Sequence, residues 1–312
     1  MEKKNKGLLG AILVIGSGIM WGHSTYFVHM LTDERYAAPG ELLSETGAAV
    51  TRLAFAFVML AIYMLTFKRK ELKADAKAVI YSILGGLIGM VFCTVIYYYS
   101  INENGSAAAA VLMYTSPAIV VVLSAIIFKE RITKIKLISL ILAFAGTVFV
   151  SGLIVGYRPL STIGLIFGAI TGVCYALYSI FSSLAMKNGA APLTVIFYAL
   201  FSASVAVMIY AAINGELVST MKTVASSNKV MLLVFGQSSF DCVLPYLAYT
   251  LGVKYTGASK ASIMSTTEIV VSALIAYVSF KEAVDIYTFI GIALVIGSII
   301  LLNLEKKDNS EE

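Results

Sequence analysis

Two stretches of the sequence decide the fold. Residues 105–130 read GSAAAAVLMYTSPAIVVVLSAIIFKE, and residues 257–282 read GASKASIMSTTEIVVSALIAYVSFKE. Each stretch begins at a glycine, continues through mostly apolar residues and ends on Phe-Lys-Glu. A run of about 20 apolar residues is the length of helix that crosses a hydrocarbon core of roughly 30 Å. We therefore expect each stretch to cross a membrane as a helix, since lipid leaves no other partner for the backbone polar groups.

Similar apolar runs occupy most of the remaining chain. Of the 312 residues, 59% are hydrophobic and only 13% are charged, whereas soluble proteins carry about 25% charged residues. The mean hydropathy is +0.88. This composition excludes a soluble protein and predicts an all-α polytopic membrane protein. We expect ten transmembrane helices, near residues 8–30, 46–67, 78–100, 106–128, 134–152, 162–186, 193–213, 230–252, 257–280 and 285–304.

The positions of the basic residues predict how the chain is oriented. With the N-terminus in the cytoplasm, 16 of the 23 lysines and arginines fall on the inner side and 5 on the outer side. Arg52 and Lys260 lie inside spans and complete the total. Because cytoplasmic loops are enriched in basic residues, we expect both termini inside and an integral protein of the cytoplasmic membrane.

The two halves of the chain resemble each other. The stretch that begins at Gly105 can be laid on the stretch that begins at Gly257 with a constant offset, and Gly10, Gly18 and Trp21 match Gly164, Gly172 and Tyr175. We expect five-helix repeats over 1–152 and 159–304, followed by a polar cytoplasmic tail over 305–312. Five is odd, so the second repeat must enter the membrane from the opposite side. This 5+5 inverted-topology repeat is typical of secondary transporters that bind solute near the midplane.

A family resemblance follows from these features. The ten expected spans, the Trp21-Gly22 pair in the first of them, and the repeated small-residue helix ending in Phe-Lys-Glu resemble the drug/metabolite transporter superfamily, EamA-like family. The resemblance extends from about residue 8 to 304. It implies a protein that moves small metabolites, often amino acids and commonly outward. Lys129 and Lys281 depart from it, since many relatives have glycine there.

Two carboxylates lie where lipid should exclude them. Asp241 and Glu268 fall at the midpoints of the expected spans 230–252 and 257–280, and their side chains are too short to reach an interface. Helical spacing places Gln237 on the face of Asp241 and Ser265 on the face of Glu268. We expect these four residues to bind the solute or couple its movement to another ion. A hydrogen-bonded structural role for the carboxylates is the alternative.

Four further residues are candidates with two interpretations each. Arg52 lies nearer the outer end of its span. It is either an anion contact at the mouth of the pathway or an anchor whose long side chain reaches the membrane surface. His23 lies deeper in its span and is a candidate for lining the pathway, whereas His29 lies at the outer interface and is expected to be solvated. The two histidines do not have the spacing of a metal site. Pro117 and Pro245 interrupt helices near their middles. Each is either a hinge that bends during transport or a static bend.

The sequence thus predicts a secondary transporter, an exporter of small metabolites such as amino acids that works by alternating access, with proton coupling left open. A lipid or headgroup flippase, or an accessory membrane subunit, remains the alternative. No phosphate-binding Gly-rich loop with Lys-Ser/Thr and no nucleophile–base pair is present, so neither ATP hydrolysis nor catalysis is expected. We expect no cofactor, no metal and no nucleic acid, with a small-molecule solute and membrane lipid as partners and a homodimer as one possible assembly.

Overall fold

The computed structural model describes residues 2–38, 40–154, 160–281 and 285–304, and within these residues the chain is helical and contains no strand. Outside this described part lie the expected tail 305–312, residue 159 at the start of the expected second repeat, and Glu282 of the second Phe-Lys-Glu triplet. Three of the basic residues counted for the orientation, Arg158, Lys306 and Lys307, also lie outside it. The prediction of an all-α polytopic membrane protein is confirmed.

The helices of the described residues span most of the chain. In chain order they are α1 (Glu2–Gly22), α2 (Ser24–Thr32), α3 (Glu45–Phe67), η1 (Arg69–Leu72), α4 (Ala76–Gly86), η2 (Leu87–Phe92), α5 (Cys93–Met113), α6 (Ser116–Phe128), α7 (Lys134–Val150), α8 (Thr162–Lys187), α9 (Pro192–Ile213), α10 (Leu217–Ser226), α11 (Asn228–Gln237), η3 (Ser238–Val243), α12 (Leu244–Thr256), α13 (Ala258–Met264), α14 (Thr267–Phe280) and α15 (Ile286–Leu304).

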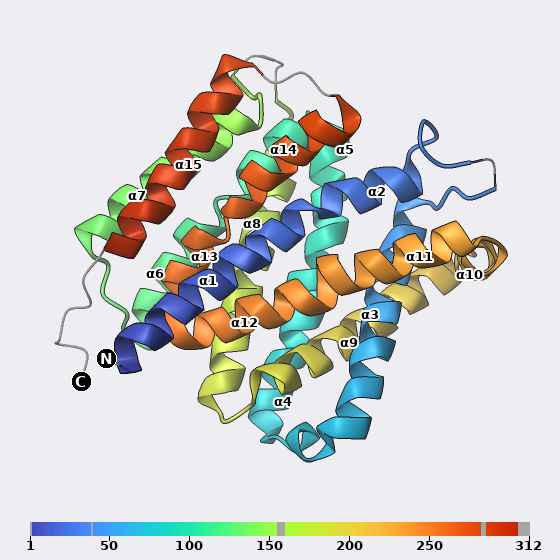
Figure 1. Ribbon diagram of the computed structural model, residues 1–312, viewed down its shortest axis with the longest axis horizontal. Helices are drawn as coiled ribbons and strands as arrows, with labels where there is room; N and C mark the ends of the chain where they lie inside the picture. Colours follow the sequence, from blue (N-terminus) through green and yellow to red (C-terminus); the bar gives the residue numbers. More distant parts are fainter. Residues whose placement is uncertain (1, 39, 155–159, 282–284, 305–312) are drawn as a thin grey trace.

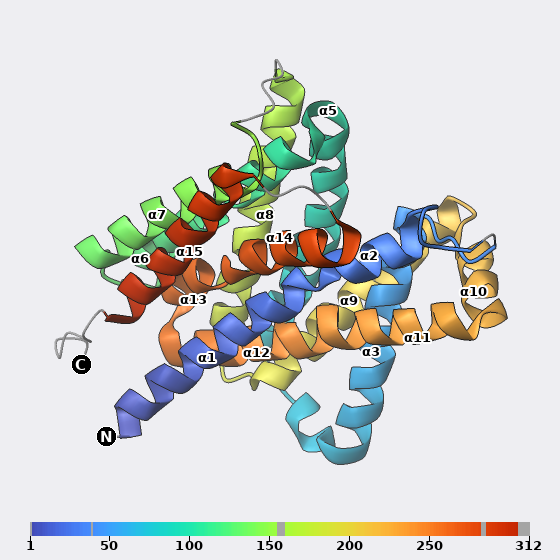
Figure 2. The ribbon, with the colours of Figure 1, turned by 45° about the horizontal axis from the view of Figure 1, so that its top comes forward.

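Helices from distant parts of the sequence pack side by side in the bundle. Helix α1 lies along α12 and α14, α5 packs on α8, and α3 packs on α9 (Figure 1). Helices α7 and α15 form a pair at one edge, which both views show (Figure 2). The first and last thirds of the chain therefore meet in the centre, where α1, α3, α8, α12 and α14 surround the site described below.

Eight helical stretches of the described residues are long and apolar enough to cross a membrane. One of them covers 53 residues, Ala76–Phe128, and takes in two of the expected spans. The expected span over 134–152 is the helix α7, which has 17 residues and is therefore short for a membrane span. These two differences account for eight stretches where the sequence predicts ten, and the number of crossings stays a prediction.

The two stretches quoted at the outset share their backbone conformations. Gly105 and Gly257 have φ of 82° and 83°, and Lys129 and Lys281 have φ of 58° and 59°. A lysine in the left-handed region is less stable by about 1 kcal/mol than a glycine in the same conformation. The positions after α6 and after α14 therefore suit glycine. Both helices nevertheless end at the same left-handed turn.

Each of these stretches is two helices rather than one. The turn at Tyr114 and Thr115 separates α5 from α6, and the turn at Ser265 and Thr266 separates α13 from α14. At the second turn the hydroxyls of Ser265, Thr266 and Thr267 donate to the carbonyls of Ser262, Ile263 and Met264. Such side-chain bonds compete with the helical backbone pattern. Glu268 therefore lies in the first turn of α14, not in the middle of a continuous helix.

Glycines allow the helices to approach closely, as expected where no hydrophobic effect drives helices together. A Cβ on Gly18 of α1 would lie 3.1 Å from the Glu268 nitrogen and from the Ser265 carbonyl oxygen. A Cβ on Gly146 of α7 would lie 2.8 Å from the Gly291 carbonyl oxygen of α15. Gly18 and Gly146 are therefore packing positions, and Gly18 packs against the backbone around Glu268.

Replacing one of these glycines tests the packing of the α7–α15 pair. We expect Gly146→Val to lower the free energy of unfolding by about 1–3 kcal/mol, the usual cost of overpacking. Gly297→Val on α15 is the matched control, because a Cβ there meets nothing within 4 Å. Thermal unfolding of both variants in detergent is the measurement. Equal shifts in the two variants would contradict close packing at Gly146.

Candidate functional site

An ion pair crosses the centre of the bundle. Arg52 on α3 donates from Nη1 to Oδ2 of Asp241 on η3 at 3.2 Å, and the side chains are 20% and 2% exposed. Ser24 at the start of α2 lies beside the same carboxylate. The sequence placed Arg52 near the outer mouth and did not predict this pairing. In this structure Arg52 is paired with Asp241 from a distant segment, and its role as an anion contact stays a prediction.

The local backbone around Asp241 explains how it reaches Arg52. Residues Ser238–Val243 form a single π-helical turn, and such turns shift the side chains that follow them and recur at functional sites. The Ser238 hydroxyl donates to the Thr51 carbonyl at 3.4 Å, which joins η3 to α3 beside the pair. Pro245 lies buried in the first turn of α12 directly after this segment.

Glu268 is the second carboxylate of the site. It is half-buried, and the Tyr175 hydroxyl of α8 donates to its Oε2 at 3.4 Å. Tyr114, in the turn between α5 and α6, lies beside it, and Asp241 and Arg52 are close enough to act on it electrostatically. Its place in the first turn of α14 favours an anion, because the helix N-terminus carries partial positive charge. The structure thus brings Arg52, Asp241 and Glu268 into one cluster.

Aromatic side chains border this cluster. A small cavity of about 10 Å³ is lined by Trp21, Tyr175, Tyr178, Tyr246 and Tyr249, with Gly89 and Ser179. This volume holds roughly one water molecule, far below the several hundred Å³ of a ligand pocket. A solute can therefore enter only if the helices around the cavity separate.

The remaining predicted residues take different positions. Gln237 is 2% exposed, and its Oε1 has no hydrogen-bond partner among the described residues. Ser265 is buried in the turn before α14 and donates to the Ser262 carbonyl. Pro117 is buried in the first turn of α6. His23 is exposed between α1 and α2, with Nδ1 2.9 Å from the Ile19 carbonyl oxygen, and does not join the cluster.

Sequence reasoning missed the aromatic lining. The signal was present in the spacing, because Tyr175 and Tyr178 are three residues apart on α8, and Tyr246 and Tyr249 are three apart on α12. Residues at this spacing lie on one face of a helix. Nothing in the sequence showed that the two faces meet each other and Trp21.

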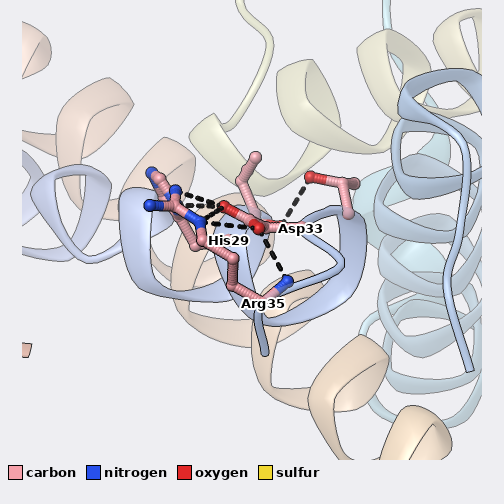
Figure 3. Close-up of polar contacts among 5 residues, drawn as sticks. His29, Asp33 and Arg35 are labelled. Carbon is pink, nitrogen blue, oxygen red and sulfur yellow. Dashed lines mark hydrogen bonds and ion pairs between the residues drawn. The ribbon is translucent and has the colours of Figure 1, made fainter. Parts of the chain in front are cut away.

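A second polar cluster lies at the end of α2, on the surface. There Arg35 donates from its side chain and backbone to Asp33, and His29 Nδ1 lies 3.5 Å from the same carboxylate (Figure 3). The Arg35 side chain, followed by its backbone N–H, holds the pKa of the Asp33 carboxyl below its usual value. The adjoining hollow of about 500 Å³ is wide open. Because these charges satisfy one another at the surface, the buried cluster is the stronger candidate.

Among the described residues, no group of three His, Cys, Asp or Glu side chains is placed to hold a metal ion. The chemistry of the buried cluster is instead that of charge recognition, with two carboxylates, one guanidinium and several tyrosine hydroxyls. Such a set can bind a charged solute or a proton inside the membrane.

Comparison with known proteins gives the family. The sequence profile of the EamA-like transporter family matches residues 8–152 and 162–304. The chain belongs to the EamA-like transporter family. It is therefore an integral membrane protein and a membrane transporter, and the resemblance read from the sequence is confirmed.

Similar proteins carry names that agree with this family. An uncharacterized transporter of Bacillus subtilis, YyaM, is 28% identical over 265 residues, which are 82% of this chain and 84% of that protein. An uncharacterized inner membrane transporter of Salmonella typhimurium, YicL, is 22% identical over 98% of both chains. A solved crystal structure aligns with a TM-score of 0.72 over 94% of this chain and 96% of the other at 16% identity, and shows the shared fold alone.

The ion pair gives a stability prediction. Arg52→Gln or Asp241→Asn leaves one buried partner without its counter-ion, and we expect each to lower the free energy of unfolding by about 3 kcal/mol. The double variant should recover most of that loss, since it removes both charges. Thermal unfolding in detergent across this double-mutant cycle is the measurement.

The control for this cycle is the exposed pair of Lys68 and Glu71, which lie 2.8 Å apart at 42% and 34% exposure. Removing Lys68 should change stability by under about 1 kcal/mol, as is usual for exposed pairs. A coupling energy between Arg52 and Asp241 no larger than that of the control pair would show that the buried contact does not stabilise the fold.

Proposed function

We propose that the protein is a secondary transporter that exports small metabolites, such as amino acids, across the cytoplasmic membrane by alternating access. Its solute and coupling site is the cluster of Arg52, Asp241 and Glu268. The observation that carries this proposal is the meeting of three ionisable side chains from α3, η3 and α14 in the bundle interior. Ionisable groups at membrane depth are costly, and they mark solute pathways or proton relays.

Alternating access is supported by the small cavity and by the interrupted helices around it. The cavity of about 10 Å³ requires helix movement before a solute fits. Pro117 and Pro245 each begin a helix beside a turn or a π segment, where the backbone can bend with few lost hydrogen bonds. We propose them as hinge positions.

The paired conformations support the inverted repeat. The turns at Tyr114–Thr115 and Ser265–Thr266, the glycines Gly105 and Gly257, and the π segments η2 and η3 occur at corresponding places in 1–152 and 159–304. We propose that these two units are related by inverted topology, with the site between them. Asp241 and Glu268 lie in the second unit and Arg52 in the first, so the ion pair joins the units.

A flippase is the less suitable alternative. A lipid headgroup would need an open lateral groove with basic contacts, whereas the guanidinium of Arg52 is bound to Asp241 and the neighbouring cavity is lined by aromatic rings. These features favour a small solute with a charged group and an apolar part.

The orientation is tested by reporter fusions after Asn309 and within 31–45. With both termini in the cytoplasm and an even number of crossings, the two reporters should lie on opposite sides of the membrane. Finding both reporters on the same side would contradict the proposed topology.

The proposed site is tested by solute flux in proteoliposomes across a pH series. A panel of amino acids and other small metabolites is compared for wild type, Glu268→Gln and Asp241→Asn. Loss of a charged hydrogen-bonding group should lower flux roughly 10-fold or more and, for Glu268→Gln, flatten its dependence on pH. Glu71→Gln, on the short helix η1 away from the cluster, is the matched control. If the variants fold and keep wild-type flux, the carboxylates have only a structural role and the proposed site is wrong.

A further inference from the structure

The two stretches that decide the fold touch each other where the first one ends and the second one begins. Glu130 closes the Phe-Lys-Glu triplet after α6, and Gly257 lies between α12 and α13. A Cβ on Gly257 would lie 3.0 Å from Oε1 of Glu130 and 3.5 Å from its Cδ. The Glu130 carboxylate therefore rests on the bare Cα of Gly257. Glycine suits this position both for the close contact and for its φ of 83°.

Glu130 is held in this position by its own half of the chain. Lys129 adopts the left-handed conformation with φ of 58°, and the Glu130 N–H then donates to the Ser124 carbonyl at 3.3 Å. Nζ of Lys136 lies 3.6 Å from Oε2 of Glu130 and donates to the Arg131 carbonyl at 2.9 Å. The turn after α6 therefore brings the carboxylate to the α12–α13 junction, and Lys136 supplies a positive charge beside it.

The position of Lys136 indicates that this ion pair is needed. Its side chain is only 7% exposed, and it lies in the first turn of α7, where the positive end of the helix dipole disfavours a cation. An unpaired ammonium group would be unstable there. The Glu130 side chain is 22% exposed, so water can solvate it when it leaves Gly257. The contact therefore joins a charge-paired carboxylate to backbone, and it can be released into water.

This contact lies at the end of the bundle where the chain begins. Gly10, near the start of α1, packs against Thr256, because a Cβ on Gly10 would lie 2.7 Å from its Cγ2. Both views show the α12–α13 junction beside the beginning of α1 (Figures 1 and 2). With the N-terminus inside, as proposed above, this is the cytoplasmic end. There the contact joins the α6–α7 connection to the α12–α13 junction.

Buried hydroxyl groups lie between this contact and the aromatic cavity. Ser259 and Ser262 on α13 follow Gly257 and are 1% and 4% exposed, and Ser262 lies beside the hydroxyl of the cavity residue Tyr249. Tyr249 also pairs with the Ser179 hydroxyl of α8 at 2.6 Å. Hydroxyl groups can exchange a protein partner for water with little change in energy. The cytoplasmic end of the cavity is therefore closed by polar groups that water can also satisfy.

We propose that Glu130, Gly257 and Lys136 form an inner latch, which closes the cytoplasmic end of the pathway while the Glu130 carboxylate rests on Gly257. The inference rests on the proposed function, because it assigns one step of alternating access to named residues. Glu130 makes the contact, Gly257 receives it, and Lys136 is a positioning residue that holds the carboxylate. When Glu130 leaves Gly257, α6 and α7 separate from α12 and α13, and water from the cytoplasm reaches the hydroxyl groups beneath.

A cysteine beneath the latch reports whether the latch is open. The native cysteines Cys93, Cys174 and Cys242 are first replaced by alanine, and Ser262→Cys then introduces a single thiol. Vesicles that expose the cytoplasmic face are treated with a membrane-impermeant maleimide, and the rate of labelling is measured. We expect slow labelling in this background, because residue 262 is buried while the latch is closed.

Two variants with matched controls separate the latch from general loosening. Gly257→Ala places a methyl group against the Glu130 carboxylate. Gly105→Ala has a similar φ of 82°, but its Cβ meets nothing within 4 Å among the described residues. Lys136→Met removes the positioning charge, whereas Lys134→Met changes an exposed lysine of the same turn. We expect Gly257→Ala and Lys136→Met to speed labelling roughly 10-fold, the effect of losing one charged hydrogen-bonding contact, and both controls to leave it unchanged.

Slow labelling in both latch variants, with thermal unfolding showing that they fold, would overturn the inference and leave the contact a structural role only. Equal acceleration by Gly257→Ala and Gly105→Ala would also overturn it, because backbone strain alone would then loosen the bundle. If Gly257→Ala does not fold, Glu130→Gln takes its place, since it removes the charge that Lys136 positions. Combining Glu130→Gln with Lys136→Met should then speed labelling no further than either change alone, because both act on one contact.

The labelling rate follows the opening of the cytoplasmic end whichever solute is carried. If the latch variants label slowly while Glu268→Gln and Asp241→Asn still lower flux in proteoliposomes, the proposed function stands and only the latch is wrong. If the latch variants label fast while both carboxylate variants keep wild-type flux, the latch is supported and the proposed solute site is wrong.

Discussion

The burial of the Asp241 carboxylate is tolerable because the Arg52 guanidinium lies 3.2 Å away. This contact holds η3 against α3, and the Ser238 hydroxyl reinforces it from the next turn. Glu268 lies beside this pair and accepts a hydrogen bond from the Tyr175 hydroxyl. The tyrosines around Glu268 and the small aromatic cavity therefore lie next to this buried ion pair.

The backbone around Glu268 is arranged to present this charge. Hydroxyls of the run Ser265-Thr266-Thr267 bond to carbonyls of the preceding turn and end α13, so Glu268 falls at the start of a new helix. Gly18 and Gly22 let α1 approach the same backbone closely, and α1 brings Trp21 to the aromatic cavity. Helix breaks and glycines weaken an isolated helix. In this protein they place the Glu268 carboxylate among aromatic rings.

Much of the fold could be predicted from the sequence, because the physics of lipid makes long apolar runs helical. The family could be predicted as well, from Trp21-Gly22 and the repeated Phe-Lys-Glu helices. Of the site, the depth of Asp241 and Glu268 was visible in the spans that contain them. The partnership of Arg52 with Asp241 was not, because it joins residues 189 apart and depends on a π turn that has no marker in the sequence. The turn before Glu268 could have been anticipated from three adjacent hydroxyl residues, and the aromatic lining of the cavity from tyrosines three residues apart. His23 lies between α1 and α2 with its Nδ1 near the Ile19 carbonyl oxygen, and its place in the pathway stays a prediction.

The most direct test concerns the charge that Arg52 does not neutralise. If Glu268 is the group that couples transport to protons, infrared difference spectra of the protein in lipid between acidic and alkaline pH show the carbonyl stretch of a carboxyl group that is protonated at the lower pH. That band should be absent from Glu268→Gln and present in Asp241→Asn. A wild-type spectrum without the band, or a band that survives in Glu268→Gln and disappears in Asp241→Asn, would contradict the assignment of the exchangeable charge to Glu268.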